Sequence, residues 1–172
     1  MITVLDIETT SKGPDGSPSP FWPSNYLVSV GYKAENIEEY FCIKHNTQKS
    51  NPLARDYIDE QLARTTLLVG HNIKFDLSWL LECGFEYDGD VYDTMIYEYI
   101  KLGGMRGGLD LSSCCRRYDI TEKIKSNQIS IDKNAGFEAI DWEVVELYGR
   151  NDVRITHELY NSQQGELNEK SN

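Results

Sequence analysis

Two carboxylates stand near the start of the chain, where a buried strand is expected. Asp6 and Glu8 are two residues apart in an otherwise apolar run. On a β-strand both side chains leave the same face, while Ile7 leaves the other. With 28 acids in 172 residues, such a pair often arises by chance. In a central strand, however, an unpaired buried charge is costly, so the pair predicts a site that supplies a partner.

Two further acids stand at unusual positions in predicted helices. Asp152 occupies the apolar stripe of the last helix, one turn after Tyr148, where a leucine ordinarily packs. A salt bridge to Arg150 or Arg154 is the ordinary explanation, but both arginines lie two residues away, on other faces of the helix. Asp76 falls in the first turn of an earlier helix, where the helix dipole alone can favour an acid.

Clustered carboxylates have a definite chemistry if these acids meet in the fold. Two carboxylates about 5 Å apart repel by on the order of 3 kcal/mol at an effective dielectric near 20. Several such pairs would consume much of a stability of about 5 to 15 kcal/mol, so protons or cations must neutralise them. An all-oxygen ligand set suits Mg²⁺ or Mn²⁺ better than zinc. Two such ions about 4 Å apart can hold a phosphodiester for attack by water.

The apolar periodicity predicts the elements that must position these acids. Strands are expected at 2–8, 26–33, 37–43, 65–69 and around Tyr92. Helices are expected at 52–64, 73–83, 94–101, 109–118 and 141–163. Asn51 and Asn72 are the expected N-caps of the first two helices, and Gly84 ends the second. The fold class is therefore α/β, a mixed sheet in which a three-stranded antiparallel meander is followed by parallel strands, flanked by helices.

Length and composition indicate one globular domain. A chain of 172 residues with 40% hydrophobic residues can bury a core. Residues 1–162 are expected to form the domain, and residues 163–172 a polar tail that frays. The proline-rich stretch 11–24 is expected to be a surface loop. The sequence has no apolar run of membrane-spanning length, no targeting signal and no CxxC pair, which favours a soluble cytosolic protein with reduced thiols and no membrane partner.

The net charge of −11 excludes a protein that grips nucleic acid by bulk electrostatics alone. Residues 101–133 are nevertheless locally positive, with seven basic residues and four acids. Their basic side chains are expected to line a path for a single strand, and the ordinary alternative is a solvated surface. The residues in question are Arg106, Arg116, Arg117, Lys123 and Lys125.

Taken in order, the acidic patterns resemble a known family. D-I-E at the start, H-N-x-x-F-D near the middle and Y-x-x-x-D near the end fall on a strand, a helix tip and a late helix. This set resembles the DEDDy branch of the DnaQ-like 3′-to-5′ exonucleases, which have the ribonuclease H-like fold. It is most similar to the proofreading domains of family A DNA polymerases, over roughly residues 1–162. Leu147 stands where the histidine branch has its base, so only the tyrosine branch fits.

The resemblance implies a metal-dependent 3′-to-5′ exonuclease that releases nucleoside 5′-monophosphates from DNA, preferably single-stranded. It implies two Mg²⁺ or Mn²⁺ ions: Asp6, Glu8 and Asp152 hold the ion on the water side, Asp6 bridges, and Asp76 supports the second ion. Tyr148 is expected to orient the attacking water rather than remove its proton, since its reference pKa is about 10. Core packing on an amphipathic helix is the alternative role of Tyr148.

Three more residues are expected to bind the substrate by the same resemblance, namely Thr9, Asn72 and Phe75. Thr9 would offer its backbone N–H to the terminal nucleotide. Asn72 is equally compatible with a plain N-cap, and Phe75 with packing in the core. His71 and His157 show no metal-like pairing, so a loop and a surface position are expected for them.

The expected partners are single-stranded DNA or frayed 3′ ends, with RNA as a further substrate and a DNA polymerase acting in trans as a protein partner. The expected location is the cytosol of a bacterium or of a phage-infected host. Two alternatives stay open. A ribonuclease D-like exoribonuclease would share the same carboxylates and tyrosine, and would differ in how the pocket treats the 2′-hydroxyl. A non-catalytic nucleic-acid-binding domain of this fold has no evident reason to retain such acids.

Overall fold

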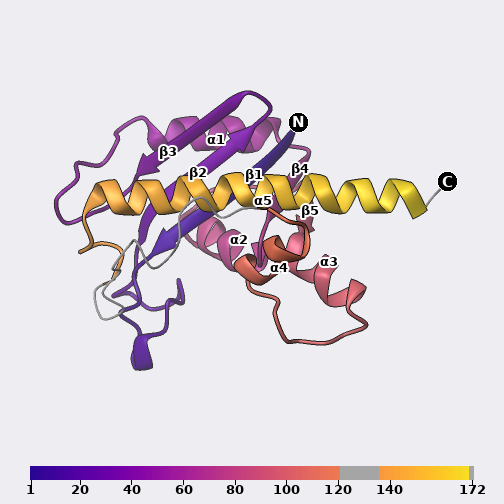
Figure 1. Cartoon of the computed structure of the whole chain (residues 1–172). Coiled ribbons are helices and arrows are strands. Elements are labelled where there is room, and N and C mark those ends of the chain that lie inside the picture. Colours follow the sequence, from indigo (N-terminus) through magenta and orange to yellow (C-terminus); the bar gives the residue numbers. More distant parts are fainter. Residues whose placement is uncertain (121–135, 171–172) are drawn as a thin grey trace.

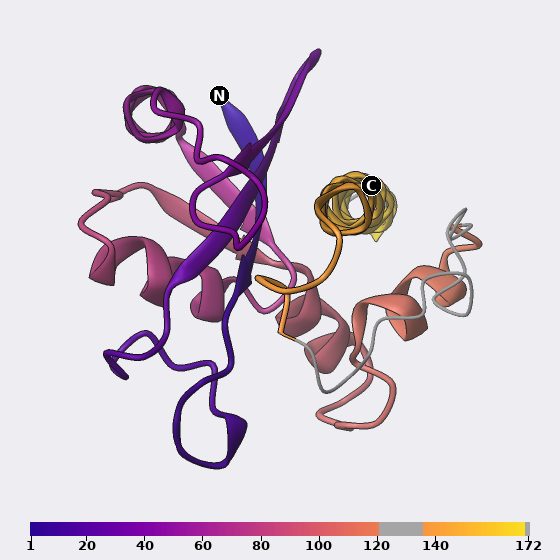
Figure 2. The ribbon, with the colours of Figure 1, turned by 90° about the vertical axis from the view of Figure 1, so that its left-hand side faces the viewer.

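A computed structural model of the protein describes residues 1–120 and 136–170, in which one mixed sheet lies between two layers of helices (Figures 1 and 2). Its five strands are β1 (Ile2–Thr9), β2 (Leu27–Ala34), β3 (Ile37–Cys42), β4 (Leu67–Gly70) and β5 (Asp90–Asp93), in the order β3-β2-β1-β4-β5. β1 pairs antiparallel with β2, and β2 with β3, whereas β4 is parallel to β1 and to β5. The predicted meander followed by parallel strands is thus confirmed, and β1 is the central strand.

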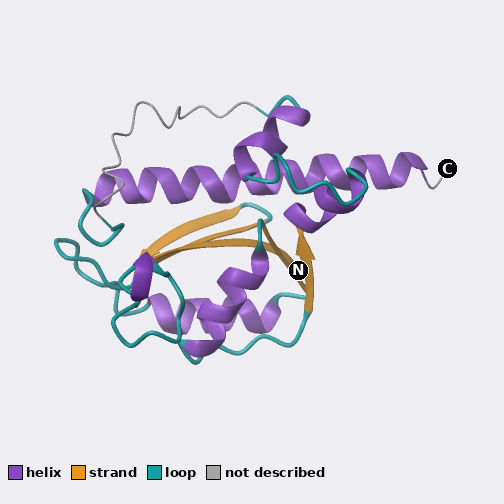
Figure 3. Cartoon of the chain, turned by 90° about the horizontal axis from the view of Figure 1, so that it is seen from below, coloured by secondary structure: helices purple, strands orange, loops and turns teal. Residues whose placement is uncertain are grey.

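Helices cover both faces of this sheet (Figures 2 and 3). One face carries α1 (Ala54–Arg64) and α2 (Ile73–Glu82). The long helix α5 (Trp142–Lys170) crosses the other face, with α3 (Thr94–Lys101) and α4 (Leu111–Arg117) beside it. A short 3₁₀ turn, η1 (Pro14–Gly16), lies in the proline-rich loop between β1 and β2.

Alternation along β1 decides which side chains meet which helix. Leu5 and Ile7 belong to the larger core cluster, which α1 and α2 complete. Val4 packs in a second cluster with Val153 and Tyr160 of α5. Because side chains two apart share a face, Asp6 and Glu8 point toward α5 as well. The two expected acids therefore leave the sheet on the side of the long helix.

One predicted helix start is wrong, and neither predicted asparagine caps its helix with its side chain. α1 begins at Ala54, after Leu53, and not at Pro52. Asn51 instead forms a local turn, in which its Oδ1 accepts the backbone N–H of Leu53 at 3.0 Å. Asn72 does stand at the start of α2, but its backbone is left-handed (φ 65°, ψ 43°) and its side chain caps no N–H. An asparagine tolerates this conformation better than most residues, so the sharp turn explains the residue type.

The last helix is longer than the sequence predicts. α5 runs to Lys170, so the expectation of a frayed tail is wrong for residues 163–170. Gln163 is fully buried, and its amide donates to the Thr94 carbonyl and to Glu98 Oε1, both at 3.1 Å. Glu166 accepts hydrogen bonds from Tyr97 and Lys101 of α3. Polar contacts rather than an apolar stripe hold this end, which is why periodicity misses it.

All four cysteines are free thiols. Within residues 1–120 and 136–170, no helix combines the length and apolar character needed to span a bilayer.

Candidate active site

Asp6 and Glu8 stand in the C-terminal half of the central strand, beside small residues of β2. Asp6 pairs with Gly31 and Glu8 with Ser29. Glu8 is 7% exposed, and Asp6 is half-buried. The regular β1–β2 register shifts immediately after Glu8, at Thr9. Small neighbours leave room above the strand for the two carboxylates.

Asp76 reaches the same strand from the other layer. β4 pairs with β1 only from Ile2 to Val4, and then the chain turns into α2. This leaves the Ile7 N–H on the edge of β1 without a β4 partner, and Asp76 Oδ1 accepts it at 3.1 Å. Asp76 is 4% exposed. The tip of α2 thus takes the place that a longer β4 would fill, and it brings a carboxylate to β1.

Two glycines bring α5 close enough to deliver Tyr148 and Asp152. A Cβ on Gly31 of β2 would lie 2.6 Å from Val153 Cγ2. A Cβ on Gly149 would collide with the ring of Tyr40 from β3. Both contacts are tighter than side chains tolerate, so glycine is required at each crossing. Gly149, which lies between Tyr148 and Asp152, is therefore required for α5 to pack against Tyr40.

The carboxylates interact with one another. Burial raises the pKa of Asp6 well above its ordinary value, and the charges of Glu8, Asp76 and Asp152 raise it further. Burial also raises the pKa of Glu8, with Asp152 and Asp76 adding to the effect. Burial raises the pKa of Asp76 to about 8 despite the opposing Ile7 hydrogen bond. The structure therefore brings together Asp6, Glu8, Asp76 and Asp152, which come from β1, α2 and α5.

Two tyrosine hydroxyls face this cluster. Burial, and then the charge of Asp152, raise the pKa of Tyr148, which also hydrogen-bonds to Asp152. Tyr40 has its pKa raised by burial and by Glu8, and it shares a 2.8 Å hydrogen bond with Ser29. Both phenols stay protonated at neutral pH. Tyr40 was missed from the sequence because no motif marks it; only its strand register opposite Gly31 brings it here.

The donor set fits a hard divalent cation by its chemistry. All four side chains offer carboxylate oxygens, and the raised pKa values of Asp6, Glu8 and Asp76 show that the ionised forms of these three acids are disfavoured without a cation. In the described part of the chain, no three His, Cys, Asp or Glu side chains already form a group that could hold a metal ion. The acids thus interact electrostatically within one site without closing around a single point.

The residues expected to bind substrate lie at two edges of the cluster. Thr9 is buried at the end of β1. Asn72 is exposed, and its backbone N–H donates to Asp93 Oδ1 at 3.0 Å. Phe75 is half-buried against the larger core cluster and also lines a cavity with Asn72. The side chains of Asn72 and Phe75 therefore remain partly open to a ligand.

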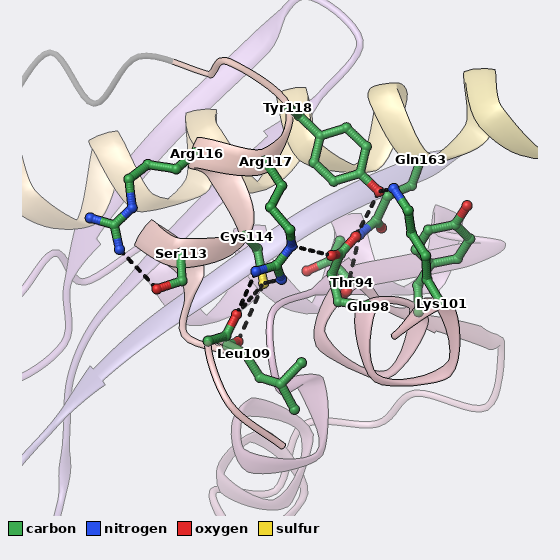
Figure 4. Close-up of polar contacts among 12 residues, drawn as sticks. Thr94, Glu98, Lys101, Leu109, Ser113, Cys114, Arg116, Arg117, Tyr118 and Gln163 are labelled. Carbon is green, nitrogen blue, oxygen red and sulfur yellow. Dashed lines mark hydrogen bonds and ion pairs between the residues drawn. The ribbon is translucent and has the colours of Figure 1, made fainter. Parts of the chain in front are cut away.

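The predicted basic path is wrong for Arg117 (Figure 4). Arg117 pairs with the fully buried Glu98 at 2.8 Å, and Tyr118 donates to the same carboxylate at 2.6 Å. Although burial disfavours its charge, these hydrogen bonds and one from Gln163 hold the pKa of Glu98 below its ordinary value. Arg116 is exposed and donates to Ser113 at 2.8 Å. The basic cluster thus partly serves to fasten α3, α4 and α5 together.

The predictions for the remaining basic residues and for the two histidines have mixed outcomes. Arg106 is exposed in the glycine-rich turn, while Lys123 and Lys125 lie outside the described residues. His71 is more than a loop residue, since its Nε2 hydrogen-bonds with the Leu109 carbonyl (2.8 Å) and its Nδ1 with the Thr94 hydroxyl (2.9 Å). Burial lowers the pKa of both His71 and His157. His71 ties the start of α2 to α3 and α4.

Comparison with known proteins places this geometry in context. A family model described as a 3′-5′ exonuclease matches residues 23–168, a range that begins after β1. DNA polymerase I of Aquifex aeolicus is 32% identical over 149 residues, which are 83% of this chain and 22% of the relative. DNA polymerase I of Borreliella burgdorferi is 31% identical over 139 residues, 78% of this chain and 15% of the relative. The chain thus spans about a fifth or less of the length of these relatives.

Solved structures share the fold. The apo form of a nuclease superposes with a TM-score of 0.68 at 17% identity, covering 99% of this chain and 74% of that one. Brucella melitensis NrnC bound to pGG gives a TM-score of 0.64 at 18% identity, covering 99% and 74%. The same protein with bound Mg²⁺ gives a TM-score of 0.63 at 18% identity, covering 99% of this chain and 75% of that one. The described fold is the ribonuclease H-like exonuclease fold.

Proposed function

Because this chain belongs to the 3′-5′ exonuclease family, we propose that it hydrolyses single-stranded DNA from the 3′ end with the help of two divalent metal ions, Mg²⁺ or Mn²⁺. The products would be nucleoside 5′-monophosphates. One observation carries the proposal: carboxylates from three separate elements meet in a single buried site, where the charges of Asp76 and Asp152 raise the pKa values of Asp6 and Glu8. That arrangement costs stability, and a bound cation offsets the cost.

Each residue of the site has a proposed role. Asp6, Glu8 and Asp152 would hold the ion on the side of the attacking water, and Asp6 with Asp76 the ion on the leaving side. Bound metal ions supply Lewis acidity and stabilise the leaving 3′ oxygen. The Tyr148 hydroxyl, protonated and hydrogen-bonded to Asp152, is suited to orient the water rather than to remove its proton.

Hydrolysis of RNA is the second candidate, because a ribonuclease D-like enzyme would share the same carboxylates and tyrosine. NrnC, which shares the fold, has been solved with pGG bound and with Mg²⁺ bound. At 18% identity the likeness supports the fold alone, so DNA remains the first proposal because the family match and the polymerase relatives both favour it.

The test offers single-stranded DNA and RNA of one sequence, each labelled at the 5′ end. With Mg²⁺ or Mn²⁺, we expect a ladder of shortened DNA that still carries the label, which establishes attack from the 3′ end. Excess chelator should abolish the ladder. Shortening that persists in chelator would refute the metal-dependent mechanism, and faster shortening of the RNA would favour the second candidate.

A further inference from the structure

The proline-rich loop presents a large exposed aromatic side chain beside the candidate active site. The loop leaves the sheet at the end of β1 and returns at β2 (Figures 1 and 2). Phe21, in a turn near the end of the loop, is 72% exposed. Single exposed apolar residues are common on protein surfaces. What distinguishes Phe21 is the rigid frame that holds it and the cavity that it borders.

Hydrogen bonds across the loop make that frame. The Asn25 side chain donates to the carbonyls of Ser17 (2.8 Å) and Ser19 (2.9 Å), and its Oδ1 accepts the Lys12 N–H at 2.6 Å. Trp79 of α2 donates from Nε1 to the Pro18 carbonyl at 2.9 Å. The loop is thus braced internally and fixed to α2. Its prolines at 18, 20 and 23 further restrict the backbone.

The loop and the tip of α2 line an open cavity of about 380 Å³. Phe21 contributes to its loop side and Phe75 to its helix side, together with Asn72 and Lys74. The lining includes one lysine and no carboxylate, although the chain carries a net charge of −11. In the described part of the chain Lys74 has no ion-pair partner. Phe75 immediately precedes Asp76, so the lining of the cavity adjoins one member of the carboxylate cluster along α2.

We propose that this cavity is a stacking subsite for one unpaired base of the substrate strand, with the base against Phe21 and a neighbouring phosphate near Lys74. The inference rests on the proposed function, because the strand must enter beside Asp76. Aromatic rings and a cation together suit single-stranded nucleic acid, and stacking tolerates every base. The subsite requires an unpaired base, so it selects single strands or frayed ends without reading sequence.

The proposal is tested by binding in excess chelator, where hydrolysis is absent. Fluorescence anisotropy measures the affinity of a labelled single-stranded DNA and of copies with one abasic sugar moved along the strand. One abasic position should weaken binding to the parent protein, and Phe21→Ala should weaken binding of intact DNA by about five- to hundredfold. In the Phe21→Ala protein, removing the base at that same position should cause no further loss of affinity. Phe21→Trp should keep the parent affinity, as should Ile100→Ala, a control on α3 that truncates an equally exposed side chain (70%).

Equal affinities of the parent and Phe21→Ala proteins, or no measurable binding by the parent, would overturn the subsite. A loss in Phe21→Ala that is the same at every abasic position would also overturn it. The nuclease assay of the parent protein decides the proposed function separately. If the parent shortens DNA while Phe21→Ala keeps full affinity, only the subsite is wrong. If the abasic position and Phe21 are coupled but no shortening occurs, binding at the subsite stands and hydrolysis does not.

Discussion

At the scale of the residue, the ionised carboxylates of the site are costly to hold together unless a cation or protons neutralise them. Burial and mutual repulsion raise the pKa values of Asp6, Glu8 and Asp76. An isolated acid in this environment would take up a proton. A metal ion instead needs the ionised form, so metal binding and proton release are linked.

Neutralising one of these acids should abolish turnover without unfolding the protein. We expect Asp6→Asn or Asp152→Asn to lower kcat by about a hundredfold or more, because each removes a proposed metal ligand. Tyr148→Phe should retain measurable activity, with a loss of about a hundredfold or less, since the hydroxyl only orients water. Asp90→Asn, an exposed acid on β5, is the matched control. Full activity in either aspartate variant would refute the assignment.

Metal-free stability should fall as pH rises. The pKa of Asp76 is raised to about 8 in the folded state, against about 4 when unfolded. The folded state therefore binds this proton more tightly, and the resulting stability is complete below pH 4 and lost as pH approaches 8. Thermal midpoints of the parent and Asp76→Asn proteins in chelator isolate this effect. The thermal midpoint of Asp76→Asn relative to that of the parent should rise from pH 5 to pH 8. A difference between the two midpoints that does not change with pH would contradict the raised pKa of Asp76.

At the scale of the element, the site depends on how closely α5 approaches the sheet. Gly149→Ala places a methyl group against the Tyr40 ring, which Ser29 and Trp142 hold in place. We expect a loss of about 1 to 3 kcal/mol of stability and a lower kcat, since Tyr148 and Asp152 move with the helix. Gly165→Ala on the same helix meets nothing within 4 Å and should stabilise by about 0.5 to 1 kcal/mol. Chemical denaturation and steady-state kinetics measure both; equal effects would refute the close approach.

The last turns of α5 should matter to the fold. A chain ending at Ser162 loses Gln163 and Glu166, and the buried Glu98 then keeps Arg117 and Tyr118 but loses one hydrogen bond. We expect a loss on the order of 2 to 4 kcal/mol relative to the full chain, from unsatisfied polar groups and lost packing. A chain ending at Asn168 is the control and should stay near the parent in thermal melts. Equal melting of the two shortened chains would support a dispensable tail instead.

The elements differ in how far sequence could predict them. Strand alternation placed Asp6 and Glu8 on one face, and the succession of strands and helices indicated an antiparallel meander followed by parallel strands. The Asp76 hydrogen bond to Ile7 depends on where β4 stops, and the role of Tyr40 depends on β2–β3 register. Gln163 is held by a hydrogen bond to the Thr94 carbonyl and Arg117 by an ion pair with Glu98, and neither contact can be read from apolar periodicity. Motifs thus predicted the carboxylates of the site, while the polar contacts around them could be found only from the three-dimensional structure.

At the scale of the whole molecule, an acidic protein is proposed to act on a polyanion. The net charge of −11 opposes such binding, so local features must overcome it. Cations at the carboxylate cluster would reverse the charge where the scissile phosphate lies. The braced aromatic loop would hold a neighbouring base. The proposed substrate, a single strand held at its 3′ end, is therefore compatible with the acidic chain if both features act as proposed.

The central claim is that carboxylates from β1, α2 and α5 form one metal-binding site. Titration with Mn²⁺, with free ion followed by electron paramagnetic resonance, tests it without any substrate. We predict that the parent protein binds Mn²⁺, that Mg²⁺ competes, and that Asp6→Asn and Asp152→Asn each weaken binding by at least about tenfold, whereas Asp90→Asn does not. Equal Mn²⁺ binding by the parent and both site variants would contradict the shared site.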